Sequence, residues 1–199
     1  MTFFLVALNI AVFLLESADM TPLIDAFALW PPPSVSLPGA PAFHVWQLGT
    51  YSLLHASVSH LFFNMFGLYM FGRDVESVLG RARLATLYAA SVLAGGLVQI
   101  AVLLASPPVG YPTVGASAGV FGMLLTYAAL FPRRRVVLLF PPIPMPAWLF
   151  AAGYAAVELL LGVSGRAAGV AHFAHLGGML GALACLILWS RRQSGRRVD

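Results

Sequence analysis

The chain has 199 residues, of which 60% are hydrophobic and 9% are charged, whereas a soluble domain has roughly 25% charged residues. This composition excludes an ordinary soluble domain and indicates a polytopic membrane protein. The net charge of +4 comes from eleven arginines and no lysine, placed mainly in short clusters between apolar segments, which is typical of membrane topology and not of nucleic-acid binding. A single cysteine, Cys185, excludes an internal disulfide framework and a cysteine-rich metal site.

Apolar runs predict six membrane-spanning helices in one domain over residues 1–199, because a span needs about 20 apolar residues. The fold class is therefore an all-α membrane protein, a bundle of six helices. The first apolar run also resembles a signal peptide, but no basic segment precedes it and no small-residue cleavage site follows it, so we expect a retained span. The predicted spans are 2–16, 52–72, 83–105, 114–131, 146–163 and 170–190.

The arginine clusters predict the orientation of the bundle, because cytoplasmic loops of membrane proteins collect positive charge. Ten of the eleven arginines lie between spans two and three, between spans four and five, or in a basic tail over 191–199. If the spans alternate, these clusters share one side, and both termini are expected in the cytoplasm. The outward segments are then 17–51, 106–113 and 164–169, and only Arg166 lies among them.

The first outward segment, 17–51, is long and rich in proline and aromatic residues. Long ordered loops are usually functional, and tryptophan favours the headgroup region of a bilayer. We expect an interfacial loop here, with a flexible linker as the alternative.

Polar side chains inside the spans are candidates for function, because lipid makes them costly unless they are paired. Ser117 lies about one turn below the outer surface on span four, and His175 lies one to two turns below it on span six. A serine and a histidine at one depth match a nucleophile activated by a base. Glycines spaced four apart would let these two helices approach closely: Gly115 and Gly119 on span four, and Gly177 and Gly181 on span six.

Span two carries His60 and Asn64 on one helix face, four residues apart. Acyl transfer needs hydrogen-bond donors around the developing oxyanion, and these two side chains would supply them beside the Ser117 backbone N–H. The alternative for the pair is a polar clamp between helices.

A metal site is the competing use of several histidines. The pairs His55/His60 and His172/His175 lack the spacing of a zinc motif, and no aspartate on the outer halves of the spans completes a ligand set, so no metal is predicted. Because no aspartate lies near His175 either, we expect a dyad. Glu158, near the outer end of span five, is expected to bond polar groups at the outer mouth of the bundle, with direct orientation of a histidine as the alternative.

These motifs together resemble the rhomboid family of intramembrane serine proteases over essentially the whole chain. The resemblance rests on their order and spacing, since each motif alone is weak. The matching stretches are His55-Ala56-Ser57-Val58-Ser59-His60-Leu61-Phe62-Phe63-Asn64, Gly72-Arg73-Asp74-Val75-Glu76 followed by Gly80, Gly115-Ala116-Ser117, and Ala174-His175-Leu176-Gly177-Gly178.

The resemblance implies a role for each matching residue. Ser117 would be the nucleophile and His175 the base, while His60, Asn64 and the Ser117 N–H would stabilise the oxyanion. Phe121 matches an aromatic position that packs against the catalytic imidazole, and Glu76 matches a structural acid. Gly115, Phe121 and Gly178 would pack around the active site.

Two positions depart from the family pattern. Ala118 follows Ser117 where the family commonly has glycine, so an extra methyl is expected to crowd the oxyanion pocket slightly. Trp46-Gln47 stands where the family has a Trp-Arg pair with a structural role, so Gln47 bears on stability and loop placement more than on chemistry. His172 stands where relatives often carry another polar residue, and its role is open.

The resemblance implies a serine endopeptidase that cleaves transmembrane helices near their outer ends, with no cofactor. The expected partners are transmembrane-helix substrates and the lipid bilayer, with no nucleic acid and no metal. The alternative is an inactive relative that binds transmembrane helices without cleaving them; a transporter would predict repeats and charged midplane residues, which are not seen. The absence of an organelle signal favours the inner membrane of a bacterium.

Overall fold

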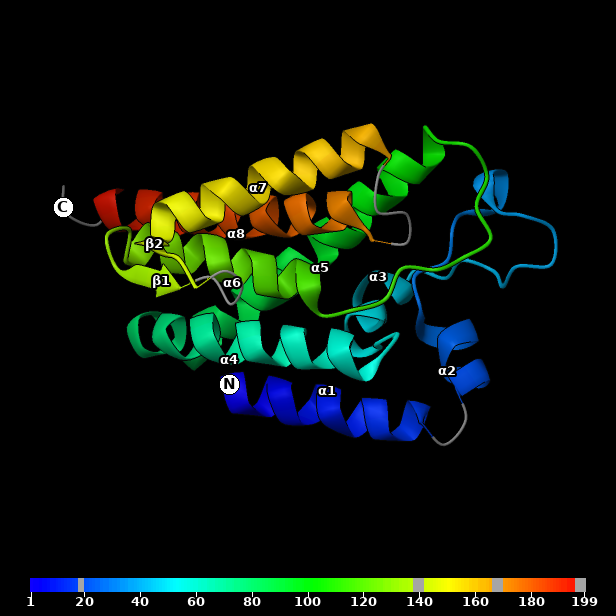
Figure 1. Ribbon diagram of the computed structural model, residues 1–199, viewed down its shortest axis with the longest axis horizontal. Coiled ribbons are helices and arrows are strands. Elements are labelled where there is room, and N and C mark those ends of the chain that lie inside the picture. The colour runs from blue at the N-terminus through cyan, green and yellow to red at the C-terminus, as the bar shows by residue number, and fades with distance from the viewer. Residues whose placement is uncertain (18–19, 138–141, 166–169, 196–199) are drawn as a thin grey trace.

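The computed structural model describes residues 1–17, 20–137, 142–165 and 170–195. Its longer helices run side by side (Figure 1) and are α1 (Thr2–Glu16), α4 (Val58–Leu79), α5 (Arg81–Leu104), α6 (Ser117–Leu130), α7 (Ala147–Ser164) and α8 (His172–Gly195). The shorter elements are α2 (Met20–Phe27), α3 (Gln47–Thr50), the 3₁₀ turns η1 (Pro33–Val35) and η2 (Tyr51–Leu53), and the strands β1 (Arg135–Val137) and β2 (Pro144–Pro146).

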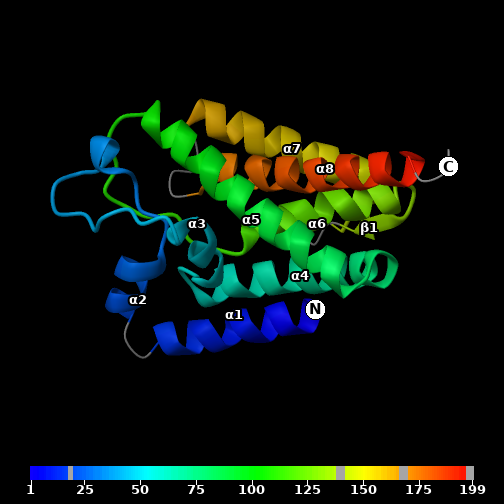
Figure 2. The same cartoon turned by 180° about the vertical axis from the view of Figure 1, so that it is seen from behind.

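The helices are arranged around α6, which meets α4, α5, α7 and α8. Helix α8 packs along both α5 and α6, while α1 lies outside α4 and α7 lies outside α6 and α8 (Figures 1 and 2). The start of α1 and the end of α8 lie at the same end of the bundle, and the long loop with α2 and α3 lies at the other. A central helix surrounded on several sides can present residues to a protected site.

Glycines allow the close packing of α8 on its neighbours. A methyl group on Gly178 would lie 2.1 Å from the carbonyl oxygen of Ala118 on α6, and one on Gly181 would lie 2.4 Å from that of Ala90 on α5. A methyl on Gly177 would lie 2.8 Å from the Ala94 oxygen, also on α5. The predicted use of Gly177 and Gly181 against span four is therefore wrong, since these two glycines face α5 and Gly178 faces α6.

Within the part of the chain that the structure describes, three helices are long and apolar enough to cross a bilayer: α5, α7 and residues His172–Arg192 of α8. Helices α1 and α6 are apolar but shorter. Helix α4 is 22 residues long, but its polar side chains make it less apolar. These elements agree with a membrane bundle that is mostly helical.

Helix α4 differs from the predicted second span, 52–72, at both ends. It begins at Val58, because residues 51–53 form a 3₁₀ turn and Ser57 caps the helix by accepting a hydrogen bond from the His60 N–H at 3.1 Å. It continues past the apolar run to Gly80, whose φ of +80° ends it in a conformation that glycine adopts readily. Hydropathy marks where the apolar side chains stop, whereas the helix stops only where its backbone turns.

The charged end of α4 is tied to neighbouring elements. Asp74 pairs with Arg134 at 2.6 Å, and the Glu76 carboxylate accepts a hydrogen bond from the Thr2 N–H at 2.8 Å. Glu76 thus joins α4 to α1, which agrees with the structural role implied for it. Strands β1 and β2 pair antiparallel beside this end, so the all-α prediction missed a small hairpin.

The segment 17–51 is held in place by hydrogen bonds to the segment 106–113. Leu29 and Thr113 exchange two backbone hydrogen bonds at 2.9 and 3.0 Å, and the Val109 N–H donates to the Val35 carbonyl at 3.1 Å. These hydrogen bonds argue against the flexible linker given as the alternative, while the interfacial position of the loop stays a prediction. Residues 18–19 of this segment, Arg166 with the rest of 166–169, and residues 196–199 of the basic tail lie outside the described part of the chain.

Gln47 is fully buried at the centre of this loop. Its side-chain oxygen accepts from the N–H groups of His44 at 3.1 Å and Trp30 at 3.3 Å. Its amide nitrogen donates to the carbonyls of Ala42 at 3.3 Å and Ala26 at 3.4 Å. One neutral side chain therefore serves as both donor and acceptor where the family has an arginine.

We expect Gln47→Arg to lower the thermal stability of the protein. A guanidinium has no acceptor, so two buried N–H groups lose their partner, at a cost of about 2 kcal/mol or more. The melting temperature in detergent measures this effect. A large change in the rate of reaction at Ser117 with an unchanged melting temperature would contradict the assignment of Gln47 to loop structure.

Candidate active site

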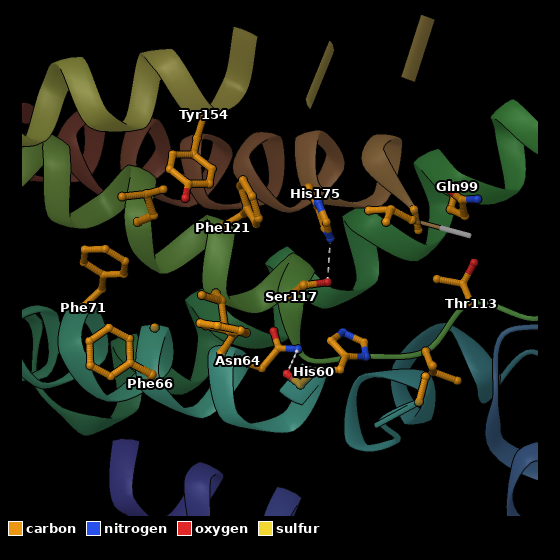
Figure 3. A pocket seen from close by; sticks show the side chains of 18 of the residues that line it. His60, Asn64, Phe66, Phe71, Gln99, Thr113, Ser117, Phe121, Tyr154 and His175 are labelled. Carbon is orange, nitrogen blue, oxygen red and sulfur yellow. Dashed lines mark hydrogen bonds between the residues drawn. The ribbon is translucent and has the colours of Figure 1, made fainter. Parts of the chain in front are cut away.

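Ser117 is the first residue of α6, and His175 lies one turn into α8. The Nε2 atom of His175 is 2.8 Å from Oγ of Ser117 (Figure 3), which is a hydrogen bond between a hydroxyl and an imidazole. His175 is buried, whereas Ser117 is partly exposed. The two residues predicted to share one depth are thus in direct contact.

Gly115 shapes the turn that leads into α6. Its φ of +123° is a conformation that side chains other than glycine rarely adopt, and a methyl there would lie 2.7 Å from Cε1 and 2.8 Å from Nε2 of His60. The Gly115 N–H also donates to the carbonyl of buried Tyr51 at 2.9 Å. The backbone before Ser117 is therefore placed directly against the His60 ring.

Phe121 lies one helical turn after Ser117 and stacks on His175. The two rings are 4.4 Å apart between centroids and 5° from parallel. This contact restricts rotation of the imidazole and keeps Nε2 directed at Ser117 (Figure 3). Phe121 is thus where the resemblance implied it would be.

His60 and Asn64 lie on one face of α4, opposite Ser117 (Figure 3). The Ser57 cap determines where His60 stands in the first turn of the helix. The Asn64 amide donates to the His60 carbonyl at 3.0 Å, and both side chains line the same cavity as Ser117 and His175. The structure therefore brings the four predicted polar residues together around one space.

The methyl group of Ala118 does not face this space. It lies against Gly95 of α5, where an added methyl would come within 2.6 Å of it. The expected crowding of the oxyanion pocket by Ala118 is therefore wrong: the helix turns this side chain away from Ser117 and toward the α5 interface.

A cavity of about 970 Å³ opens beside Ser117. Ser117, His175, His60 and Asn64 line one part of it, and further polar side chains such as Gln99 and Thr113 line another (Figure 3). Its remaining walls come largely from apolar side chains of α4, α6 and α7. Such a cavity suits an apolar ligand whose one polar point is presented to Ser117. Among its lining residues are Phe150 and, as Figure 3 shows, Phe66, Phe71 and Tyr154.

Glu158 of α7 forms a cluster with the two histidines of α8. Its Oε2 atom lies 2.6 Å from Nδ1 of His172 and 2.9 Å from Nδ1 of His175, and all three residues are buried. The first contact is a hydrogen bond, while the second lacks the alignment of one. Glu158 thus contacts His175 directly, which fits the alternative predicted for it from the sequence, the orientation of a histidine.

These three side chains are also the candidate metal ligands among the described residues. Their donor atoms all lie within 4.8 Å of one another. The signal that could have found the cluster was present in the sequence, since positions 172 and 175 share a helix face and position 158 lies near the same end of the preceding helix.

His55 lies outside the cavity lining, behind His60. It is fully buried, its ring meets the His60 ring edge to face at 5.2 Å, and its backbone N–H donates to the carboxylate of Glu16 at 3.2 Å. Glu16, on α1, is fully buried as well. Sequence reasoning missed this acid, which holds the chain just before α4 and so supports the position of His60.

A comparison with known protein families identifies this architecture. The family model of the Rhomboid domain matches residues 42–192. The chain belongs to the rhomboid family. The match covers every element that contributes to the site except α1, and it makes this rhomboid a multi-pass membrane protein.

Individual relatives of this rhomboid come from several organisms. Rhomboid protein 1, mitochondrial, of Saccharomyces cerevisiae is 35% identical over 138 residues, or 65% of this chain and 38% of that protein. RHOMBOID-like protein 12, mitochondrial, of Arabidopsis thaliana is 31% identical over 175 residues, or 81% of this chain and 51% of that protein. Rhomboid protease GluP of Bacillus subtilis is 38% identical over 91 residues, or 45% of this chain and 17% of that protein. The chain therefore spans about half or less of the length of these relatives.

Proposed function

We propose that this rhomboid is an intramembrane serine endopeptidase with Ser117 as nucleophile and His175 as base. The observation that carries the proposal is the 2.8 Å contact between Nε2 of His175 and Oγ of Ser117. The imidazole that makes this contact is stacked on the ring of Phe121. A serine hydroxyl becomes a useful nucleophile when an adjacent base takes its proton. The name of the Bacillus subtilis relative, a rhomboid protease, supports the same activity.

The reaction follows from this contact. Oγ of Ser117 attacks the carbonyl carbon of a peptide bond while its proton moves to Nε2 of His175. The tetrahedral intermediate then breaks its C–N bond, and His175 returns the proton to the leaving amine. Water then attacks the acyl-serine carbon while its proton moves to the same nitrogen. The C–Oγ bond breaks, His175 returns the proton to Oγ of Ser117, and the new carboxyl end leaves.

The negative charge of the intermediate needs donors near Ser117. The first turn of an α-helix has backbone N–H groups without intrahelical acceptors, and Ser117 opens α6 in that position without a side-chain cap. His60 and Asn64 face the same space from α4. The Asn64 amide donates to the His60 carbonyl. To reach the oxyanion, the amide group would rotate away from this carbonyl or donate to both acceptors.

The proposed substrate is a transmembrane helix cleaved near its outer end. The apolar cavity walls suit side chains from a membrane segment, and α7 is packed mainly on α6 and α8, leaving its other faces open to such a segment. The backbone of a helix is fully hydrogen-bonded, so the substrate must unwind locally before Ser117 can attack it.

We propose six spans with both termini in the cytoplasm. The clustered arginines and the shared end of α1 and α8 support this arrangement. The inner membrane of a bacterium stays a prediction, since the named relatives include mitochondrial and bacterial proteins.

The rival function is a rhomboid relative that binds transmembrane helices without cleaving them. A fluorophosphonate separates the two, because it reacts with an activated serine and needs no known substrate. We expect intact mass and peptide mapping of the detergent-purified protein to find the adduct on Ser117, and His175→Ala to prevent it. A folded protein that stays unlabelled would favour the non-cleaving binder.

We expect Asn64→Ala to reduce turnover by about 10²-fold, less than the loss of Ser117, because the Ser117 N–H and His60 still face the oxyanion. The labelling rate at saturating fluorophosphonate measures this effect. An unchanged rate would remove Asn64 from the oxyanion role and leave it as a hydrogen-bonded residue of α4.

A further inference from the structure

We infer that Glu158 is a positioning residue for His175, so that the catalytic unit is a chain from Ser117 through His175 to Glu158. This inference rests on the proposed function and deepens it. It replaces a two-residue unit with one in which a buried carboxylate on α7 acts through the imidazole on α8.

The contacts on the two sides of the His175 ring carry the argument. Nε2 lies 2.8 Å from Oγ of Ser117, and Nδ1 lies 2.9 Å from Oε2 of Glu158. The ring therefore stands between a hydroxyl and a carboxylate, with Phe121 stacked on its face. The Glu158 contact is within hydrogen-bond distance without the alignment of a hydrogen bond, and catalytic contacts of this kind commonly tighten when a substrate binds.

The carboxylate would decide which ring nitrogen holds the proton. An ionised carboxylate can only accept hydrogen bonds, so it favours the form of His175 that carries its proton on Nδ1. Nε2 then presents a lone pair to Ser117, as a general base must. The same carboxylate offsets the positive charge that His175 gains when it takes the serine proton.

His172 keeps Glu158 in place. Its Nδ1 is 2.6 Å from the same Oε2 atom, and its ring is almost perpendicular to that of His175, at 86°. Because His172 and His175 lie three residues apart on α8, one carboxylate from α7 contacts two imidazoles on one helix face. Ser117 on α6 completes the set of polar groups around the ring.

The distances in this cluster fit shared protons better than a metal ion. Zinc bonds to nitrogen and oxygen are about 2.0–2.2 Å long, which places tetrahedral ligand atoms roughly 3.3 Å apart. The observed separations of 2.6 and 2.9 Å are both shorter than that, and the 2.6 Å contact of His172 is a hydrogen bond to a carboxylate.

The test is Glu158→Gln, which keeps the shape of the side chain but removes its charge, measured with the fluorophosphonate. We expect the maximal labelling rate at Ser117 to fall about 10²-fold, while the concentration for half-maximal rate and the melting temperature change little. Glu158→Asp, which restores a carboxylate on a shorter stem, should recover part of the rate.

Two further variants separate positioning from structure. Asp74→Asn is the control, because it removes the charge of a carboxylate that pairs with Arg134 at the charged end of α4 and does not line the cavity; it should leave the labelling rate unchanged. In a His175→Ala background, Glu158→Gln should cause no further loss, since a residue that acts through His175 has no effect without it.

Three outcomes would overturn the inference. In the first, the wild-type protein and the Glu158→Gln variant are labelled at Ser117 at the same rate. This result refutes the role of Glu158 and leaves the proposed function intact. Another is a lower melting temperature with an unchanged rate, which gives Glu158 a structural role. The third is a rate that changes with a chelator and reverts with Zn²⁺, which assigns the cluster to a metal. If the wild-type protein is not labelled at all, the result contradicts the proposed function itself, and the inference about Glu158 falls with it.

Discussion

Replacing Ser117 with alanine should abolish peptide-bond cleavage and fluorophosphonate labelling while leaving the bundle folded. The hydroxyl is the group that bonds to the acyl carbon, and removing a nucleophile of this kind costs about 10⁴-fold or more in turnover. Ser117 is partly exposed to the cavity, and its side chain is not part of the packed core. The measurement is cleavage of a reconstituted single-span protein, with the melting temperature taken in parallel.

The matched control is Ser164→Ala, which removes an exposed serine at the end of α7 that bonds only its own helix. This variant should cleave and label normally. His175→Ala should lose as much activity as Ser117→Ala, and the double variant should lose no more, because the two residues act as one unit. Full activity in either single variant would contradict the proposed pair.

Gly178→Ala should have the second large effect, on both stability and activity. The added methyl would lie 2.1 Å from the carbonyl oxygen of Ala118 and 2.7 Å from its carbon, and a backbone group cannot move aside as a side chain can. Helices α6 and α8 would have to separate, which costs about 3 kcal/mol or more and draws His175 away from Ser117. We expect a lower melting temperature and loss of labelling at temperatures where the protein is still folded.

Gly153→Ala on α7 is the matched control, because a methyl there meets no atom within 4 Å. Alanine is the better helix former by about 1 kcal/mol, so this variant should be as stable as the wild type or slightly more stable. If Gly178→Ala behaved in the same way, close approach of α6 and α8 at that glycine would not hold the site together.

The depth of Ser117 and His175 was predictable because depth depends on topology and helix length alone. Charge clusters orient the spans, and counting residues from the outer surface then brings both side chains to one level. The position of Phe121 on the same face as Ser117 follows from helix periodicity in the same way. No knowledge of how the helices pack is needed for these statements.

Contacts between particular helices were not predictable. The glycine pattern at 177 and 181 indicated a close approach, but α5 and α6 both offer small residues, and the sequence does not say which of them α8 meets there. The methyl of Ala118 was expected near the oxyanion because Ala118 directly follows Ser117 in the sequence. Its direction depends on how far α6 is rotated about its axis, and packing against Gly95 decides that rotation.

The sequence by itself determined that this protein is a membrane bundle with a serine and a histidine at one depth and two polar residues on a facing span. Apolar composition, arginine placement and helical period suffice for that, because each is a local property of the chain. Only the tertiary structure decided that Oγ of Ser117 and Nε2 of His175 are in contact, and that Glu158 reaches the far side of the same ring. Such contacts depend on the distance, rotation and crossing angle of separate helices, which the close packing of many side chains sets together.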